Sequence, residues 1–175
     1  MVEKDSQWPS NANAYRLEHV IGSGSFGLVW RATCLQPGPN CGVVVAIKIV
    51  DLETFPNTSI QHIRQEIAIM SLSKHKNIVP DCISFVDRQF LWIVMPLIEC
   101  GSIADIVRNT LPKEKRGIDD ETIIATIAKQ TLEGLEYLHK SGQIHRDIKA
   151  ANILLDKNGN VLLSDLGVSA TLKKG

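Results

Sequence analysis

Apolar residues recur at every second position in the first part of the chain, which is the spacing of strands with one buried face. Leu17, His19 and Ile21 alternate in this way and run into a glycine-rich turn. Further strands are predicted at residues 28–34, 43–50, 83–86 and 91–95, where β-branched and apolar residues lie between turn residues. The pattern predicts an antiparallel sheet that starts at Tyr15. Residues 1–14 are rich in Ser, Asn and Pro and are expected to form a flexible leader.

A helical spacing separates the third predicted strand from the fourth. Thr58 followed by Gln61 resembles a capping box, which marks the start of many helices. The apolar residues that then recur three or four positions apart are Ile60, Ile63, Ile67 and Met70. The spacing predicts one helix, ending near Ser73, that packs on the sheet.

The pattern becomes mainly helical after the proline-containing connector PLIECGS at residues 96–102. The elements predicted there are a short helix at 102–107, a long amphipathic helix at 120–140 closed by Gly142, and a hairpin of strands 153–155 and 161–163 around Asn158-Gly159. We therefore predict an α+β fold of two lobes. A complete small antiparallel-sheet lobe with one helix covers residues 15–95, and the first part of a helical lobe covers residues 96–175.

Composition and charge exclude several classes of protein. The chain has 19 basic and 19 acidic residues among 175, so it lacks the basic excess of a protein that binds nucleic acid or anionic lipid. The four cysteines form no C-x-x-C pair and have no histidine at metal-ligand spacing, which favours reduced thiols over zinc or redox chemistry. No signal peptide or membrane span is predicted. We expect a cytoplasmic protein that does not bind nucleic acid.

The glycine-rich turn matches G-x-G-x-x-G-x-V from Gly22 through Gly24 and Gly27 to Val29. Glycines at this spacing let backbone N–H groups approach a polyphosphate without interference from Cβ atoms. A dinucleotide-binding turn is the rival interpretation, but it needs a helix directly after the glycines, and the sequence VWRATCL is typical of a strand. The turn by itself is a weak signal.

Lys48 lies within the apolar run VVVAIKIV, where a buried ammonium group needs an anionic partner. Glu66 offers one, since it lies on the helical stripe that faces the sheet, three residues after Ile63 and four before Met70. Alternatively, Lys48 extends to solvent and Glu66 lies at the edge of the stripe. After a glycine-rich turn, the two together favour a lysine that binds phosphate and is positioned by a glutamate.

The strongest signal is the run HRDIKAAN at residues 145–152, followed thirteen residues later by Asp165-Leu166-Gly167. Phosphoryl transfer needs a carboxylate that orients the attacking hydroxyl and oxygen ligands for Mg²⁺. Asp147 suits the first role, and Asn152 and Asp165 suit the second. Any one of them alone would more often serve a turn or a helix cap, but their joint spacing favours the catalytic interpretation.

In this order along one chain, GSGSFGLV, VAIK, Glu66, HRDIKAAN and DLG resemble the protein kinase family over residues 15–175. The resemblance implies the protein kinase fold, with ATP and Mg²⁺ bound between its two lobes. By position, Ile21, Val29 and Ala46 would contact the nucleotide from the small lobe and Leu154 from the large one. Met95 would be the gatekeeper, and the Pro96 carbonyl and the Ile98 amide would meet the adenine edge.

The resemblance also implies an activity. Lys149 matches the lysine that Ser/Thr kinases place near the γ-phosphate, which implies an ATP-dependent protein serine/threonine kinase with Ser or Thr acceptors in protein substrates. Arg146 matches the residue through which many kinases read a phosphorylated activation loop, which implies an upstream activating kinase as a partner. The segments LWIVMPLIECGSIADIV, TLEGLEYLHKSGQIHRDIKAANILL and DLGVSATL resemble the sterile-20-related kinases, particularly their oxidative-stress-responsive and proline-alanine-rich branch. A role in a signalling or stress-response cascade is implied.

Two features depart from the family pattern. Leu166 replaces the usual Phe, an apolar exchange with which activity should survive. The sequence also ends at TLKKG, inside the expected activation loop, and the A-P-E segment does not appear. A nucleotide-binding fragment or pseudokinase-like scaffold without transfer activity is therefore the alternative, and a kinase for a small metabolite is a third. We also expect the isolated chain to aggregate or stay partly molten, because the predicted helix at 120–140 has a broad apolar face.

Overall fold

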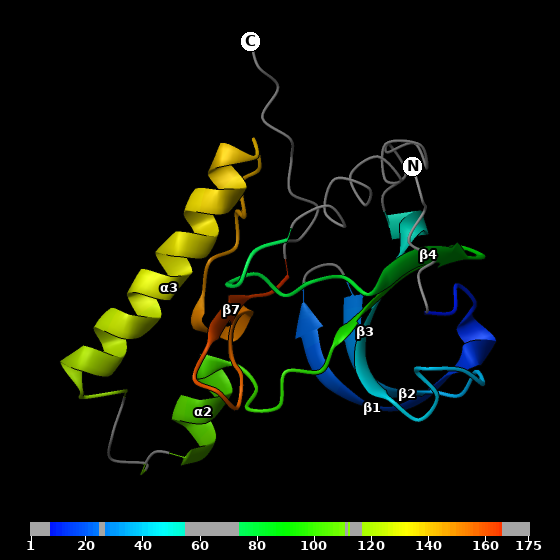
Figure 1. The fold of residues 1–175 in the computed structure, drawn as a ribbon, viewed down its shortest axis with the longest axis horizontal. Coiled ribbons are helices and arrows are strands. Elements are labelled where there is room, and N and C mark those ends of the chain that lie inside the picture. The colour runs from blue at the N-terminus through cyan, green and yellow to red at the C-terminus, as the bar shows by residue number, and fades with distance from the viewer. Residues whose placement is uncertain (1–7, 25–26, 55–73, 111, 113–116, 166–175) are drawn as a thin grey trace. The chain divides into compact units, whose positions relative to one another are not determined.

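The structure is a computed structural model that describes residues 8–24, 27–54, 74–110, 112 and 117–165 (Figure 1). The chain divides into two compact units. The first comprises residues 1–72 and 80–97, and the second comprises residues 73–79 and 98–175. Each unit has its own sheet.

The first unit is built on a five-stranded antiparallel sheet with the strand order β1-β2-β3-β5-β4. The strands are β1 (Tyr15–Gly24), β2 (Gly27–Cys34), β3 (Val44–Asp51), β4 (Ile83–Asp87) and β5 (Phe90–Pro96). Short 3-10 turns, η1 (Ala12–Ala14) and η2 (Leu52–Thr54), precede β1 and follow β3. The strands predicted at residues 28–34, 43–50, 83–86 and 91–95 are confirmed to within one residue at each end, and β1 continues to Gly24, three residues beyond Ile21. The predicted helix from Thr58 to Ser73 lies outside the described residues.

Residues 8–14 pack against the sheet, although composition alone predicted a flexible leader. The Tyr15 hydroxyl donates a buried hydrogen bond of 2.7 Å to the Pro9 carbonyl, and Trp8 packs against the same apolar core. The Tyr15 ring stacks on Phe85, which in turn stacks on Trp92. Burial raises the pKa of the Tyr15 hydroxyl. Aromatic packing therefore orders a segment whose Ser, Asn and Pro content is typical of a loop.

The second unit combines two helices with a small hairpin. Its elements are α2 (Ile103–Thr110), α3 (Glu121–Lys140), the 3-10 turn η3 (Ala150–Asn152), β6 (Ile153–Leu155) and β7 (Val161–Leu163). The predicted long helix is confirmed, and the predicted short helix begins one residue later than expected and extends to Thr110. The hairpin is also confirmed, since β6 and β7 pair antiparallel. The apolar residues buried most deeply here are Ile78, Leu138, Val161 and Leu163.

Side chains outside the helices determine where both helices begin. The Asp120 carboxylate accepts hydrogen bonds from the amides of Thr122 and Ile123, which would otherwise lack partners in the first turn of α3. The Ser102 hydroxyl does the same for the Asp105 amide in α2. After the end of α3, Gly142 adopts a left-handed conformation with φ of 74°. These caps explain why the sequence signals for the helix ends were accurate.

Residues 74–79 pack on α3. The Lys74 amide donates to the Tyr137 hydroxyl, and the His75 ring stacks on the Tyr137 ring at 5.0 Å. The Asn77 amide group donates to Gln130 of α3 at 3.0 Å and to the Val161 carbonyl at 2.8 Å. The segment also runs beside β7, because the Leu163 amide donates to the Asn77 carbonyl and the Val79 amide donates to the Leu163 carbonyl. Strand β7 is thereby held from both sides, which fixes the start of the segment that carries Asp165.

The turn between β6 and β7 is wider than a two-residue Asn-Gly turn. The Asp156 amide donates to the Asn160 carbonyl, and the Gly159 amide donates to the Asp156 carbonyl. Gly159 adopts φ of 81°, as expected for a three-residue loop that ends in a left-handed glycine. Hydrogen bonds from Asn158 and Asn160 to the Asp156 carboxylate stabilise the loop and lower the pKa of Asp156, with Asn160 the larger cause. The predicted strands of the hairpin are therefore confirmed, but its loop has three residues rather than two.

Among the residues that the structure describes, no helix is both long and apolar enough to cross a membrane.

Candidate active site

The loop after α3 brings three of the predicted catalytic and metal residues into direct contact. The Asp147 carboxylate lies 2.7 Å from the Lys149 ammonium nitrogen and accepts a hydrogen bond of 3.0 Å from the Asn152 side-chain amide. The same Asn152 nitrogen also donates to the Asp147 backbone carbonyl at 2.8 Å. The carboxylate therefore has a fixed position and a cation beside it.

These contacts favour the ionised form of Asp147. The hydrogen bond from Lys149 is the largest cause of a lowered pKa for this carboxyl, and the hydrogen bond from Asn152 and the charge of Lys149 lower it further. Partial burial acts in the opposite direction and does not outweigh them. Asp147 is therefore a carboxylate at neutral pH and can accept a hydrogen bond from a hydroxyl group.

His145 joins the catalytic loop to the strand that precedes Asp165. Its side chain is only 3% exposed, its Nδ1 lies 3.3 Å from the Asp147 amide, and its Nε2 lies 3.0 Å from the Ser164 carbonyl. An amide donates and a carbonyl accepts, so both contacts are hydrogen bonds only when the imidazole is neutral and protonated on Nε2. Sequence reasoning assigned no role to His145, although it opens the run HRDIKAAN that was the strongest signal in the sequence.

A second connection links Asn152 to Ser164. The Ser164 amide and hydroxyl both donate to the Asn152 carbonyl, at 2.9 Å and 3.2 Å. Asp165 follows directly with φ of 55°, and Arg146 on the opposite loop has φ of 67°. Left-handed conformations are uncommon for residues other than glycine and often occur at functional sites. The two predicted metal ligands, Asn152 and Asp165, are thus carried by segments that are hydrogen-bonded to each other.

Other predicted nucleotide contacts of the second unit lie next to these segments. Leu154 of β6 forms a bridge with Ser102, at the start of α2. The Ile98 carbonyl accepts a hydrogen bond of 3.2 Å from the Gly101 amide, which turns the connector toward α2. The position of Leu154 is therefore tied to the end of the connector.

In the first unit, the sheet register aligns the predicted nucleotide contacts on three neighbouring strands. Val29 of β2 is the cross-strand partner of Lys48 in β3, and Ala46 of β3 is the partner of Met95 in β5. Paired residues share a face of a sheet, and alternate residues of a strand share it as well. Val29, Ala46, Lys48 and Met95 therefore lie on one face. Lys48 is only 6% exposed, as the sequence argument required.

The glycines of the predicted phosphate-binding turn have different environments. Gly24 pairs with Gly27 at the tip of the β1–β2 hairpin, and Gly22 pairs with Val29. Gly27 has φ of 144°, and a Cβ atom there would lie 2.1 Å from the Ile49 carbonyl oxygen, so only glycine fits. A Cβ atom at Gly22 would make ordinary contacts of 3.7 Å or more.

The predicted site residues divide between the two units. Ile21, Gly22, Gly24, Gly27, Val29, Ala46, Lys48, Met95 and Pro96 belong to the first, and Ile98, Asp147, Lys149, Asn152, Leu154 and Asp165 belong to the second. Glu66 lies outside the described residues. The assigned roles of all these residues stay predictions.

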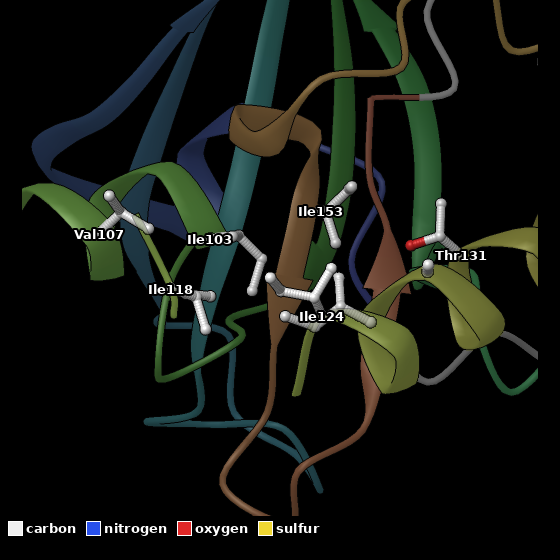
Figure 2. A pocket seen from close by; sticks show the side chains of 8 residues that line it. Ile103, Val107, Ile118, Ile124, Thr131 and Ile153 are labelled. Carbon is white, nitrogen blue, oxygen red and sulfur yellow. The ribbon is translucent and has the colours of Figure 1, made fainter. Parts of the chain in front are cut away.

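An apolar groove in the second unit contains none of the predicted site residues. It has a volume of about 390 Å³ and lies between α2, α3 and β6, as Figure 2 shows. Its lining residues are Ile103, Val107, Ile118, Ile124, Ile127, Ala128, Thr131 and Ile153. Further apolar side chains of α3 are open to solvent, including Leu132, which is 63% exposed. None of the described residues that line the groove is charged, so this lining does not suit a nucleotide.

Comparison with known proteins gives the family. A family model described as the protein kinase domain matches residues 15–175. The chain belongs to the protein kinase family. The protein kinase fold expected from the sequence motifs is therefore confirmed, with the five-stranded sheet and the α2–β7 region corresponding to its small lobe and part of its large lobe.

Curated kinases match almost the whole chain. Serine/threonine-protein kinase fray2 of Dictyostelium discoideum is 49% identical over 165 residues, which cover 94% of this chain and 15% of that protein. Germinal center kinase 3 of Caenorhabditis elegans is 42% identical over 171 residues, which cover 95% of this chain and 28% of that protein. Serine/threonine-protein kinase sid1 of Schizosaccharomyces pombe is 42% identical over 166 residues, which cover 94% of this chain and 33% of that protein. The resemblance to the sterile-20-related kinases is confirmed. The kinase chain spans between 15% and 33% of the length of these three relatives.

Proposed function

We propose that the protein transfers the γ-phosphoryl group of ATP to a Ser or Thr hydroxyl of a protein substrate. The observation that supports this most is the Asp147 carboxylate, held at 2.7 Å by Lys149 and at 3.0 Å by Asn152 and ionised at neutral pH. Phosphoryl transfer depends on positioned charge, and this arrangement provides an anion to orient a hydroxyl and a cation beside it.

Each residue of the loop has a role in this proposal. The substrate hydroxyl oxygen forms a bond to the γ-phosphorus, the bond to the leaving ADP oxygen breaks, and the hydroxyl proton passes to Asp147. Lys149 offsets negative charge on the transferring group. His145 is a positioning residue, because its ring connects the Asp147 amide to the Ser164 carbonyl. In the first unit, Lys48 would bind phosphate oxygens, and Glu66 would position the Lys48 side chain.

The metal-binding part of the proposal rests on the chemistry of two side chains. The Asn152 amide nitrogen is engaged with Asp147, so its amide oxygen is the atom that it can offer to a cation. Asp165 adds a carboxylate on the segment bonded to Asn152 through Ser164. Carboxylate and amide oxygens suit Mg²⁺, which would neutralise charge on the ATP phosphates when bound. Asn152 and Asp165 therefore fit the metal that the kinase family uses.

The cellular role is proposed from the relatives. The names of fray2 and sid1 describe serine/threonine-protein kinases, and another relative, 42% identical over 158 residues, is named mitogen-activated protein kinase kinase kinase kinase 3 in Homo sapiens. We infer a cytoplasmic kinase in a signalling or stress-response cascade, acting on protein substrates and activated by an upstream kinase through Arg146.

The experiment measures Mg²⁺-dependent phosphorylation of a generic Ser/Thr protein substrate by the intact protein, with ATP binding measured in parallel. Asp147→Asn should lower the transfer rate by about 10²- to 10⁴-fold, the range for loss of a general base, while ATP still binds. Asp87→Asn, at the end of β4, is the matched control and should transfer at the wild-type rate. ATP binding without transfer in the wild type would instead support the pseudokinase-like alternative.

A further inference from the structure

The hairpin that carries the glycine-rich turn contains two one-residue bulges on β1. Leu17 pairs with Ala32 and His19 with Arg31, which leaves Glu18 as the extra residue. A second register shift lies between Val20 and Gly22 and leaves Ile21 as the extra residue. The bulges determine which residue of β1 opposes each residue of β2.

Hydrophobic patterning does not specify this register. Val20 and Ile21 are adjacent, both apolar and almost equally exposed, at 42% and 41%. A shift of one residue would exchange the faces on which they lie with little change in buried apolar area. Among the described strands, β1 is also an edge strand that pairs only with β2. Another interaction must therefore fix the pairing.

Glu18 supplies that interaction with its side chain. One carboxylate oxygen accepts a hydrogen bond of 2.5 Å from the Thr33 hydroxyl, and the other forms an ion pair with the Arg31 guanidinium. The Glu18 and Arg31 side chains are only 21% and 33% exposed, so solvent screens the pair incompletely. Arg31 and Thr33 are alternate residues of β2, so a single carboxylate connects two successive positions on one face of the strand.

The contacts lie on the face of the sheet that carries the proposed nucleotide residues. Arg31 is the cross-strand partner of Ala46, and Val29 of the same strand is the partner of Lys48. Fixing Glu18 against Arg31 and Thr33 therefore fixes β1 relative to Val29 and Ala46. If Glu18 loses these contacts, the bulge can migrate, and His19 can take the place of Val20 opposite Trp30.

We propose that Glu18 is a positioning residue that locks the register of the glycine-rich hairpin and thereby keeps Ile21 and Gly22 in place for ATP. The proposal rests on the proposed kinase function for its consequence, and the register itself can be measured without nucleotide. A slipped register binds ATP poorly, so the apparent affinity falls in proportion to the fraction of molecules in the native register.

The first measurement is cross-strand disulfide formation in the intact protein, located by peptide mass mapping. Val20→Cys with Trp30→Cys joins the residues paired in the native register, and His19→Cys with Trp30→Cys joins those paired after a one-residue slip. Paired residues of antiparallel strands have Cα atoms close enough for a disulfide. With Glu18 present, the 20–30 bond should form. With Glu18→Ala, it should decrease and the 19–30 bond should appear.

The second measurement is the kinetic consequence of Glu18→Ala without added cysteines. We expect KM for ATP and the Kd for Mg-ADP to rise about tenfold if the native register falls to about a tenth of the population. The value of kcat should not change, because saturating ATP selects the native register. Arg16→Ala, which removes an exposed charge from the same strand, is the matched control and should leave both constants unchanged.

Two results would overturn the proposal. One is a 20–30 cross-link that Glu18→Ala leaves at the wild-type level. The other is a fall in kcat with an unchanged KM for ATP. If the wild-type protein binds no ATP, the proposed kinase function fails, and the cross-links still decide whether Glu18 sets the register.

Discussion

Two glycines with almost the same positive φ allow a steric clash to be separated from the strain of that φ. Gly27 has φ of 144° and Gly38 has φ of 143°. A Cβ atom at position 38 would meet nothing within 4 Å, whereas one at position 27 would lie 2.1 Å from the Ile49 carbonyl oxygen and 3.0 Å from its carbon. The substitutions Gly27→Ala and Gly38→Ala therefore both place a side chain at a positive φ, and only Gly27→Ala also introduces a clash.

The magnitudes follow from these contacts. Placing alanine in such a sparsely populated region at positive φ costs about 1–3 kcal/mol, and both variants carry this cost. Relieving the contact at position 27 requires a movement of the backbone, since Ile49 meets the new Cβ with main-chain atoms rather than with a flexible side chain. Overpacking costs about 1–3 kcal/mol, and the clash is severe enough to favour the upper end. We expect Gly27→Ala to destabilise the β2–β3 pairing by about 2–3 kcal/mol more than Gly38→Ala.

Native-state hydrogen exchange of the intact protein, read from peptides that cover β2 and β3, measures this local free energy directly. Protection of the amides near the Leu28–Ile49 pair should fall strongly in Gly27→Ala and slightly in Gly38→Ala. Equal losses of protection in the two variants would show that the close approach of β2 to the Ile49 carbonyl does not exist in the protein.

Three further predictions concern other parts of the molecule. Gly134→Ala puts a Cβ 2.8 Å from the Asn77 carbonyl oxygen and should lower the free energy of hydrogen exchange in α3 by about 1–3 kcal/mol. At Gly117 a Cβ meets nothing within 4 Å, so the control Gly117→Ala should cost about 1 kcal/mol or less. Burial raises the pKa of Asp81 to about 6 from 3.8, so the stability that this group contributes is complete below pH 3.8 and is lost as the pH rises through 6. Melting curves between pH 4.5 and 8 should show Asp81→Asn removing the part of this fall that lies in that range, about 2 kcal/mol, and parallel curves would contradict it. His145→Phe keeps an aromatic ring at this position and removes both hydrogen bonds. We expect kcat to fall by up to about 10²-fold with KM for ATP little changed. An unchanged kcat would refute the positioning role.

Local signals explain why most elements could be predicted from the sequence. The strands of the first unit follow the two-residue apolar spacing, and the long helix begins at the carboxylate of Asp120 and ends before Gly142, as their residue types indicate. The motif at residues 145–152 singled out Asp147, Lys149 and Asn152, and these residues are in contact because they lie within one short loop.

Features that depend on distant parts of the chain could not be predicted in the same way. The packing of Trp8 requires the apolar core built by four strands, and the docking of residues 74–79 on α3 depends on Gln130 and Tyr137, which lie more than fifty residues away. The bulge at Glu18 also leaves no local signal, because Val20 and Ile21 satisfy either register equally well. Side-chain contacts across strands, rather than periodicity, decide such details.

The central claim is that the Asp147 carboxylate supports phosphate transfer to Ser or Thr. The most direct test is a single turnover of the intact protein with Mg-ATP labelled in the γ-phosphate and a protein substrate that offers Ser, Thr and Tyr, followed by phosphoamino acid analysis. We predict label on Ser or Thr that falls by at least about 10²-fold in Asp147→Asn. Label on Tyr alone, or transfer by Asp147→Asn at the wild-type rate, would contradict the account.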